Sequence, residues 1–266
     1  MTSTVEVSLF DQKIEEQEAP KFSAFRQAVD HVQSPRDANL IKLLYLGAFR
    51  VSEISTKISP YEETHQMTRA YGKAFRWHLT DFTSKNDTFL MESAIAKRTR
   101  QKDGQEHLTF KQIALPVDPN FEPWSRDLLK CAIQQADLSI KLGTKQLLDK
   151  GIKDPQLHRK MKRELMERSL RVRLGRAGIE YILRQNLGSL LPRKDKHNNR
   201  NPLRHWRLSH LAEVYDFDGY DLTQIAGWSY GSSMAGQGAS GMLDHYLHLS
   251  WKKYYQKLCV PLADVM

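Results

Sequence analysis

The hydrophobic period of the chain changes twice along its length, and this change limits the fold more than any other feature. Between residues 74 and 117, three runs have the alternating, β-branched and aromatic character of strands: KAFRWHLTDF, DTFLMESAIAKR and LTFKQIALPV. The polar segment RQKDGQEH, with Asp103-Gly104 as a hairpin turn signal, separates the last two runs. Helical patterns lie on both sides of this block. We therefore expect a mainly helical α+β chain with a small antiparallel three-stranded sheet.

Start and stop signals place the helices before the block. Ser34 offers an N-cap hydroxyl, Pro35 suits the first helical position, and apolar residues from Leu40 to Leu46 form a buried face. Gly47 ends this helix, and the chain resumes in helical style from Arg50 to Ile54. The sequence thus predicts two helices separated by a glycine turn.

After the block the pattern is helical from Trp124 onward. Two further helices are expected around 203–215 and 221–228, followed by a flexible Gly- and Ser-rich loop and a last helix near 241–258. No internal repeat or heptad array interrupts this order.

Length and charge suggest one domain with an anionic partner. Residues 1–20 are polar and are expected to be a mobile segment, which leaves 21–266 as one domain with a basic helical extension at about 140–190. Lys and Arg total 40 against 31 acidic residues, for a net charge of +9. Such a surplus is consistent with nucleic-acid binding, although many basic proteins bind none.

Composition also excludes several classes of protein. Cys131 and Cys259 have neither disulfide-framework nor zinc-site spacing, which fits a reducing compartment. No stretch approaches the ~20 apolar residues that span a membrane, and the mixed, acidic N-terminus is unlike a secretory signal. We expect a soluble cytoplasmic protein.

Two segments contain arginines suited to a phosphate. In LLYLGAFRVSEIS, Arg50 follows the glycine turn, and its planar guanidinium can bind two phosphate oxygens. In NPLRHWRLSHL, Arg204, His205 and Arg207 crowd the start of a helix, where the helix terminus also favours an anion. Taken alone, each segment has a plainer interpretation: a surface arginine paired with Glu53, and an amphipathic helix with solvated bases.

Two later segments contain candidate aromatic groups. Trp228 in AGWS can present its indole N–H to a phosphate oxygen, and Tyr246 in LDHYLHLSWKKYY lies between two histidines on the expected last helix. By themselves these are better interpreted as a core tryptophan and a half-buried tyrosine.

The order of the four segments resembles the tyrosine recombinase, or phage integrase, family, with its archaeal and archaeal-virus members the most similar. That family has a G-x-R-x-x-E motif, a hairpin lysine, an H-x-L-R-H motif, a G-H or G-W pair, and a tyrosine with a histidine two residues later. The corresponding segments here are Gly47–Glu53, Asn201–His205, Gly227-Trp228 and Tyr246–His248. The resemblance covers residues about 20 to 260 and implies the recombinase catalytic fold for 21–266.

Three departures from the family pattern stand out. Asn201 replaces the first histidine of its motif; an amide can hydrogen-bond a phosphate but cannot carry a proton. The segment from Trp228 to Tyr246 is longer than usual, and only about 35 residues precede the first helix signal, so a separate core-binding domain is not evident.

The resemblance implies DNA strand transfer without metal or cofactor. Arg50 and Arg204 would clamp the scissile phosphate, Trp228 and Asn201 would add neutral hydrogen bonds, and Tyr246 would attack to give a 3′-phosphotyrosine.

The leaving 5′-oxygen needs a proton, which a hairpin lysine supplies in the family. Lys97 is the first choice here and Lys102, in the turn, is the second, whereas His205 is expected to be a helper or structural residue.

A basic stretch at 156–176 is the expected DNA-tracking surface. The side chains expected to contact DNA are Arg159, Lys162, Arg163, Arg171 and Arg173, together with Lys102, His205 and Arg207. A solvated helix with Glu164 and Glu167 in local ion pairs is the equally weighted alternative.

The implied partners are double-stranded DNA, three further copies of the chain in a tetramer on paired sites, and accessory DNA-binding factors, with association to the nucleoid. A C-terminal face could dock on a neighbouring subunit or pack on its own core; it comprises Leu249, Trp251, Tyr255 and Leu258.

Three other functions remain open. A topoisomerase-IB-like enzyme would share the chemistry but reseal one duplex. A non-catalytic DNA-binding protein derived from an integrase would keep the basic surface without the reaction. A structural or RNA-binding basic protein would leave the order of the four segments unexplained.

Overall fold

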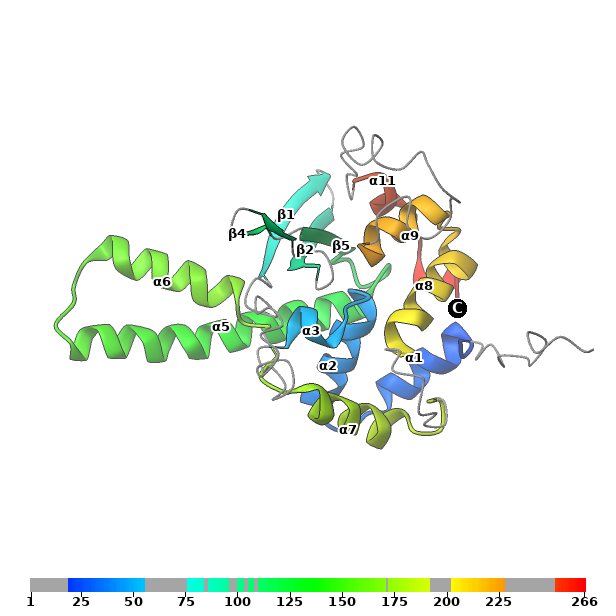
Figure 1. Ribbon diagram of the computed structural model, residues 1–266, viewed down its shortest axis with the longest axis horizontal. Helices are drawn as coiled ribbons and strands as arrows, with labels where there is room; N and C mark the ends of the chain where they lie inside the picture. The colour runs from blue at the N-terminus through cyan, green and yellow to red at the C-terminus, as the bar shows by residue number, and fades with distance from the viewer. Residues whose placement is uncertain are drawn as a thin grey trace, which may run out of the picture.

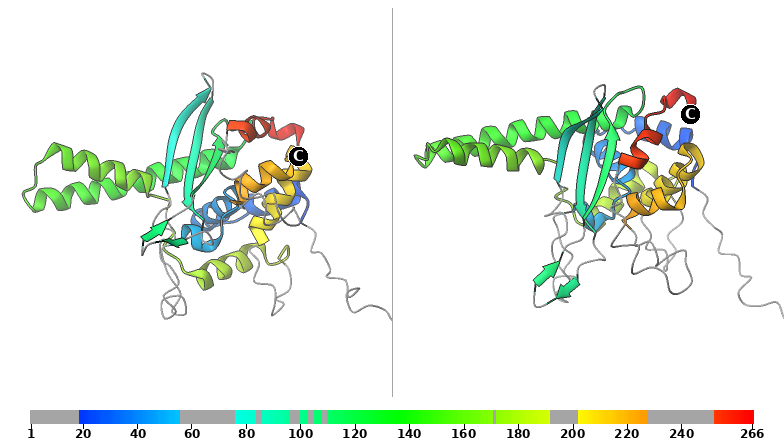
Figure 2. Two further views of the ribbon diagram at one scale, coloured as in Figure 1. Left: turned by 45° about the horizontal axis from the view of Figure 1, so that its top comes forward. Right: turned by 90° about the horizontal axis from the view of Figure 1, so that it is seen from above.

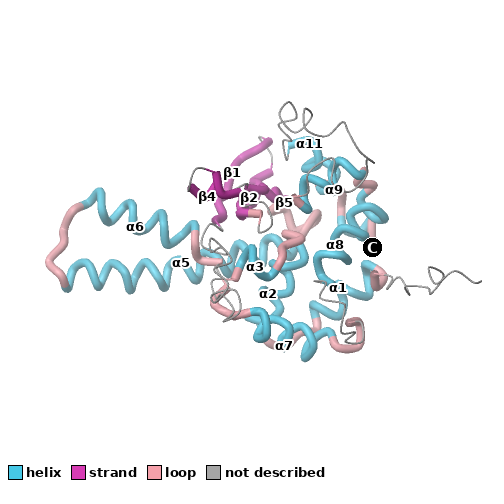
Figure 3. Tube along the Cα trace, in the orientation of Figure 1, coloured by secondary structure: helices cyan, strands magenta, loops and turns pink. Residues whose placement is uncertain are grey.

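A computed structural model describes residues 19–55, 76–83, 86–95, 100–102, 105–107, 110–170, 172–191, 202–227 and 252–266 (Figure 1). These residues form a helical body with a small antiparallel sheet on one side and a two-helix arm that projects from it (Figures 1 and 3). The expected mainly helical α+β class is confirmed.

Helix α2 (Pro35–Leu46) runs through the middle of the body. Its expected start is confirmed, because the Ser34 hydroxyl accepts a hydrogen bond from the Asp37 backbone N–H and Pro35 occupies the first turn. Leu44, Tyr45 and Leu46 are fully buried, and the helix packs against α1 (Phe22–Asp30), α5 and α8. Because α2 is buried on most sides, it holds the segments at both of its ends in fixed positions.

A tight turn links α2 to the short helix α3 (Val51–Ile54). Gly47 caps α2, and a β-carbon at this position would overlap the buried ring of Phe49. Ala48 adopts a left-handed conformation with φ of 43°. The turn therefore presents its backbone carbonyls in a fixed direction.

The sheet has the strand order β1-β2-β5, with β1 at Arg76–Thr83, β2 at Asn86–Ala94 and β5 at Phe110–Pro116, all antiparallel. Phe89 pairs with Leu115 and Met91 pairs with Ile113, and these side chains are buried in the main core. The expected three strands are confirmed.

A second, two-stranded ladder lies between β2 and β5 in the sequence. β3 (Arg100–Lys102) pairs with β4 (Gln105–His107), and the pair projects away from the body (Figure 2). The strands flank the expected hairpin turn, whose residues Asp103 and Gly104 lie outside the described part of the chain.

The arm consists of α5 (Pro123–Asp149) and α6 (Pro155–Glu167). The buried residues of α5 end at Ala136, and α6 has none. Gly143 lets the helices approach, since a β-carbon there would lie 2.8 Å from the Met161 sulfur. The outer arm thus packs mainly on itself (Figures 1 and 2).

The basic stretch at 156–176 is not one continuous helix. Helix α6 ends at Glu167, and the backbone of Val172 then forms a bridge to Ser55 beside α3. Helix α7 begins only at Arg176 and continues to Leu187. The chain leaves the arm to return to the body, which separates Arg173 from the basic residues of α6.

Two helices after α7 agree with the sequence. Helix α8 (Pro202–Tyr215) packs against α2, and α9 (Gly219–Ala226) packs against β5. Helix α9 ends at Gly227, which has a φ of 65° and closes the helix in the left-handed conformation that glycine favours.

At the C-terminus, α11 (Lys252–Tyr255) leads into two 3₁₀ turns at Gln256–Leu258 and Leu262–Asp264. Tyr255 and Leu258 are 1% and 3% exposed, so the docking-face interpretation is wrong for both and the own-core alternative holds. Leu249 and Trp251 lie outside the described residues, as does the expected helix before residue 252.

None of the helices in the described part of the chain combines the length and the apolar character needed to cross a membrane.

Candidate functional site

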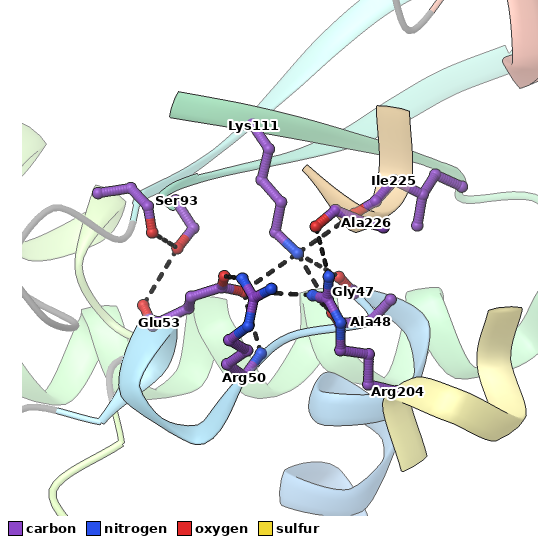
Figure 4. A network of polar contacts seen from close by, with 10 residues as sticks. Gly47, Ala48, Arg50, Glu53, Ser93, Lys111, Arg204, Ile225 and Ala226 are labelled. Carbon is purple, nitrogen blue, oxygen red and sulfur yellow. Dashed lines mark hydrogen bonds and ion pairs between the residues drawn. The ribbon is translucent and has the colours of Figure 1, made fainter. Parts of the chain in front are cut away.

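The candidate site is centred on the carboxylate of Glu53, whose side chain is fully buried. Glu53 lies in the first turn of α3, and its Oε2 accepts a hydrogen bond of 3.0 Å from the backbone N–H of Arg50. This local contact fixes the carboxylate at the point where the α2–α3 turn meets β5 and α9 (Figure 4).

Three cationic side chains from different parts of the chain surround Glu53 (Figure 4). Arg50 Nη1 lies 2.9 Å from Oε1, Lys111 Nζ lies 3.1 Å from Oε2, and Arg204 Nη1 lies 3.9 Å from the same oxygen. Arg204 comes from the first turn of α8 and Lys111 from β5. Among the described residues, this one carboxylate therefore faces three cations, which leaves a surplus of positive charge within this set.

Backbone carbonyls at the ends of α2 and α9 hold the two more deeply buried cations, Arg204 and Lys111. Arg204 donates to the carbonyls of Ala48, at 2.6 Å, and Ala226, at 2.5 Å. Lys111 Nζ lies 3.2 Å from the carbonyl oxygens of Gly47, Ala48 and Ile225. Carbonyls at the C-terminal end of a helix have no partner within it and carry partial negative charge, so they suit buried cations.

The pKa values of the cluster reflect this crowding. Burial lowers the pKa of Lys111 to about 8 despite the nearby Glu53 carboxylate. Burial and then the charge of Arg50 lower the pKa of Arg204 to about 10. Burial alone would raise the pKa of Glu53, but Lys111, Arg204 and Arg50 outweigh it and hold that pKa below its usual value. A further anion nearby would favour the charged forms of Lys111 and Arg204.

Exposure decides which cations such an anion can reach. The Arg50 side chain is 23% exposed, that of Arg204 is 9% exposed and that of Lys111 is 1% exposed. The side chain of Arg50 is therefore the most open of the three to an external anion, followed by that of Arg204. Lys111 lies beneath them.

The structure brings together two of the six residues expected to be catalytic. Arg50 and Arg204, far apart in the sequence, lie against the same carboxylate. The other four lie outside the described residues: Lys97, Asn201, Trp228 and Tyr246.

Among the expected DNA contacts, Arg207 requires a correction. It is 1% exposed and lies over the rings of Tyr45 and Tyr215, at 5.1 Å and 5.8 Å from their centroids. Its helix turns this arginine into the core rather than toward solvent, so Arg207 cannot contact DNA. His205, on the opposite side of α8, is exposed.

The other expected DNA contacts are on the surface or undescribed. Arg159, Lys162 and Arg163 are exposed on α6, where Arg163 also pairs with Glu167 at 2.9 Å, and Arg173 is exposed after the arm. The side chain of Lys102 and the whole of Arg171 lie outside the part of the chain that the structure describes.

Sequence reasoning missed Lys111. Its signal is the alternation in FKQIALP: Lys111 occupies the same inward register as Ile113 and Leu115, where an apolar residue is the usual choice. A lysine at such a position needs buried anionic or carbonyl partners.

Among the described residues, no group of three or more His, Cys, Asp or Glu side chains is arranged to hold a metal ion. Comparison of the chain with models of protein families, with curated proteins and with solved structures found no match.

Proposed function

We propose that this chain is a DNA strand-transfer enzyme of the tyrosine recombinase type. In this proposal Arg50 and Arg204 bind the non-bridging oxygens of a scissile phosphodiester, and Tyr246 is the nucleophile. The observation that supports it most is the meeting of these two guanidiniums at one buried carboxylate, in a cluster with surplus positive charge.

The cluster fits the electrostatic needs of this reaction. A phosphodiester is anionic and repels a nucleophile, and negative charge grows on its oxygens in the transition state. Cations held in advance by Glu53 and by backbone carbonyls stabilise that charge without having to reorganise. Arginine suits the task because its planar fork matches two oxygens of a phosphate.

The chemical step is balanced within the DNA and the tyrosine. A bond forms between the Tyr246 phenol oxygen and phosphorus, and the bond from phosphorus to the 5′-oxygen breaks. The phenol passes its proton to water. The leaving 5′-oxygen takes a proton from Lys97, or from Lys102 as the second choice, and that lysine regains its proton from water. The 5′-hydroxyl of another strand can then reverse the step and rejoin DNA.

Exposed basic residues outside the cluster would hold the duplex. Arg159 and Lys162 on α6 and Arg173 after the arm are positioned for sequence-tolerant contacts to phosphates. In this proposal the functional assembly is a tetramer on paired sites.

The test uses nicked duplexes with randomised flanks, in which cleavage near the nick releases a short 5′-hydroxyl fragment and traps the adduct. We expect a protein–DNA adduct that survives denaturation and is resolved by gel electrophoresis. Tyr246→Phe should give no adduct, because it lacks the nucleophilic oxygen, while still binding duplex DNA.

The matched control is Tyr181→Phe, which removes the same oxygen from an exposed tyrosine on α7 and should leave adduct formation unchanged. DNA binding without any adduct would favour the non-catalytic DNA-binding alternative. An adduct that persists in Tyr246→Phe would refute the assignment of the nucleophile.

A further inference from the structure

Lys111 is the most deeply buried cation of the cluster and links most of the elements that build it. It lies on β5 and reaches the α2–α3 turn through Gly47 and Ala48, α3 through Glu53, and the end of α9 through Ile225. Its ammonium group also lies 4.7 Å from the centroid of the Phe49 ring. These contacts tie together segments that are 58 to 114 residues apart in the sequence.

The carbonyl of Ala48 links Lys111 directly to the guanidinium expected to bind the anion. It accepts from Lys111 Nζ at 3.2 Å and from Arg204 Nη1 at 2.6 Å. At the end of α9 the two cations use consecutive carbonyls, Ile225 for Lys111 and Ala226 for Arg204. Any movement of the turn or of the helix end would therefore move Arg204 as well.

Glu53 provides the second link, on the side of Arg50. Its Oε2 contacts Lys111 and its Oε1 contacts Arg50, so the lysine balances part of the carboxylate charge. Without that balance Glu53 would draw both guanidiniums toward itself, and they would present less of their charge to an external anion.

We propose that Lys111 is a positioning residue that keeps Arg50 and Arg204 aimed at one external anion, through Glu53 and the Ala48 carbonyl, without touching that anion. The inference rests on the proposed function only in that the anion is a DNA phosphodiester. Its direct test needs only a simple divalent anion.

The probe is sulfate, which keeps its charge throughout the pH range used. Specific binding stabilises the folded state in a saturable way, whereas the general effect of sulfate on protein surfaces keeps rising with concentration. Thermal unfolding is measured in sodium sulfate and in sodium chloride of equal ionic strength, for the wild type, Lys111→Met and Lys42→Met. Lys42 is a matched control, a buried lysine that links α2 to Asp127 of α5 at 2.7 Å.

We expect Lys111→Met to weaken saturable sulfate binding by about tenfold or more, because the variant loses one positive charge near the anion and the contacts that fix both guanidiniums. Lys42→Met should lose stability but keep the wild-type sulfate affinity. If Lys111 were only a link within the core, both variants would lose stability and both would keep that affinity. Wild-type affinity in Lys111→Met would therefore overturn the proposal, and so would the absence of saturable binding in the wild type.

The pH dependence of the wild type provides a second measurement if Lys111→Met does not fold. The titratable groups facing Lys111 are Glu53, Arg50 and Arg204. The pKa of Glu53 is lowered from its usual value and that of Arg204 is about 10, so neither group titrates mainly between pH 7 and 9. Because the pKa of Lys111 is about 8, sulfate affinity should fall over that range as the lysine loses its proton. An affinity that stays constant from pH 7 to 9 would count against the proposal.

The two proposals can fail separately. Sulfate binding that depends on Lys111, without any DNA adduct, would leave this inference standing and refute the enzyme. A DNA adduct from the wild type, with sulfate binding and adduct rate unchanged in Lys111→Met, would do the reverse. If both hold, Lys111→Met should slow adduct formation at saturating DNA. The dissociation constant for duplex DNA should stay within about twofold, because the exposed basic residues outside the cluster would hold the duplex.

Discussion

At the scale of single residues, two of the buried carboxylates that the structure describes, Glu53 and Glu122, have contrasting partners. Glu122 forms a one-to-one pair with Arg26, with both side chains almost fully buried. Glu53 instead neutralises part of a cluster of three cations. The first arrangement is balanced in charge, whereas the second has three cations for one carboxylate among the described residues.

This contrast predicts how each carboxylate responds to neutralisation. Glu53→Gln should lower the free energy of unfolding by about 3–5 kcal/mol, because it leaves buried cations without their counter-ion. Sulfate should restore part of that loss, since an external anion can reach Arg50, which is 23% exposed. Chemical denaturation in sulfate and in chloride of equal ionic strength measures both effects.

Glu122→Gln is the matched control. It should cost a similar free energy of unfolding, but sulfate should restore none of it beyond its effect on the wild type, because Arg26 is only 2% exposed. Equal recovery of the two variants would show that the Glu53 cluster is not an anion site.

At the scale of elements, the ends of helices build the site. The α2–α3 turn and the end of α9 supply the carbonyls that hold Arg204 and Lys111. Helix α9 is fixed at its start by Asp218, whose Oδ1 accepts from the backbone N–H groups of Tyr220 and Asp221. Its end depends on the left-handed Gly227.

Substitution of Gly227 should therefore affect the site as well as the fold. In Gly227→Ala the alanine backbone would keep the strained left-handed conformation, which costs about 1–2 kcal/mol of stability. Its β-carbon would also lie 2.9 Å from the Ile95 side chain. The strain acts one residue from the Ala226 carbonyl that holds Arg204, so saturable sulfate binding should weaken together with stability.

Asp218→Ala provides the comparison at the other end of the same helix. Loss of this N-cap should cost about 1 kcal/mol of stability and leave sulfate affinity close to wild type. Calorimetric unfolding with and without sulfate distinguishes the two ends. If Gly227→Ala loses stability alone, the end of α9 does not shape the anion site.

At the scale of the whole molecule, the arm and the body are built differently. The body contains the main core, whereas the arm beyond Ala136 adds no buried residue through Ser169. The arm contains exposed lysines and arginines, and the views in Figures 1 and 2 show it projecting beyond the sheet. In the proposed function, the arm would contribute to DNA affinity with little contribution to folding.

Shortening the arm tests this division. Replacing residues 144–160 with a short Gly-Ser turn joins Gly143 to Met161, which already lie side by side. The midpoint of thermal unfolding should change by less than about 4 °C. Duplex affinity should fall, and the slope of its logarithm against the logarithm of salt concentration should decrease by about 0.9 for each phosphate that the shortened arm no longer neutralises. The cations removed are Lys145, Lys150, Lys153, Arg159 and Lys160.

A full-length arm with these five residues changed to glutamine separates charge from length. Both variants should lose the same part of the salt dependence, measured by fluorescence anisotropy with labelled duplex DNA. An unchanged slope in both would show that the outer arm does not contact phosphates.

Local features of the fold could be read from the sequence because their causes lie within a few residues. The Ser34 cap, the Pro35 start and the Gly47 stop of α2 depend on contacts between neighbours in the chain. The three strands of the sheet follow from side-chain alternation. For Tyr255 and Leu258 the sequence does not decide between docking on a neighbouring subunit and packing in the chain's own core, because an apolar pattern does not show which surface covers it.

Tertiary structure alone decided which charged residues are buried and what they meet. Arg204 and Arg207 lie three residues apart on α8, yet Arg204 joins the cation cluster around Glu53, whereas Arg207 lies in the core against the Tyr45 ring. The sequence could nominate Arg50 and Arg204 as a pair, but it assigned Lys111 no role. The partners of a buried charge come from remote segments, and only the packed chain brings those carbonyls and carboxylates within hydrogen-bonding distance.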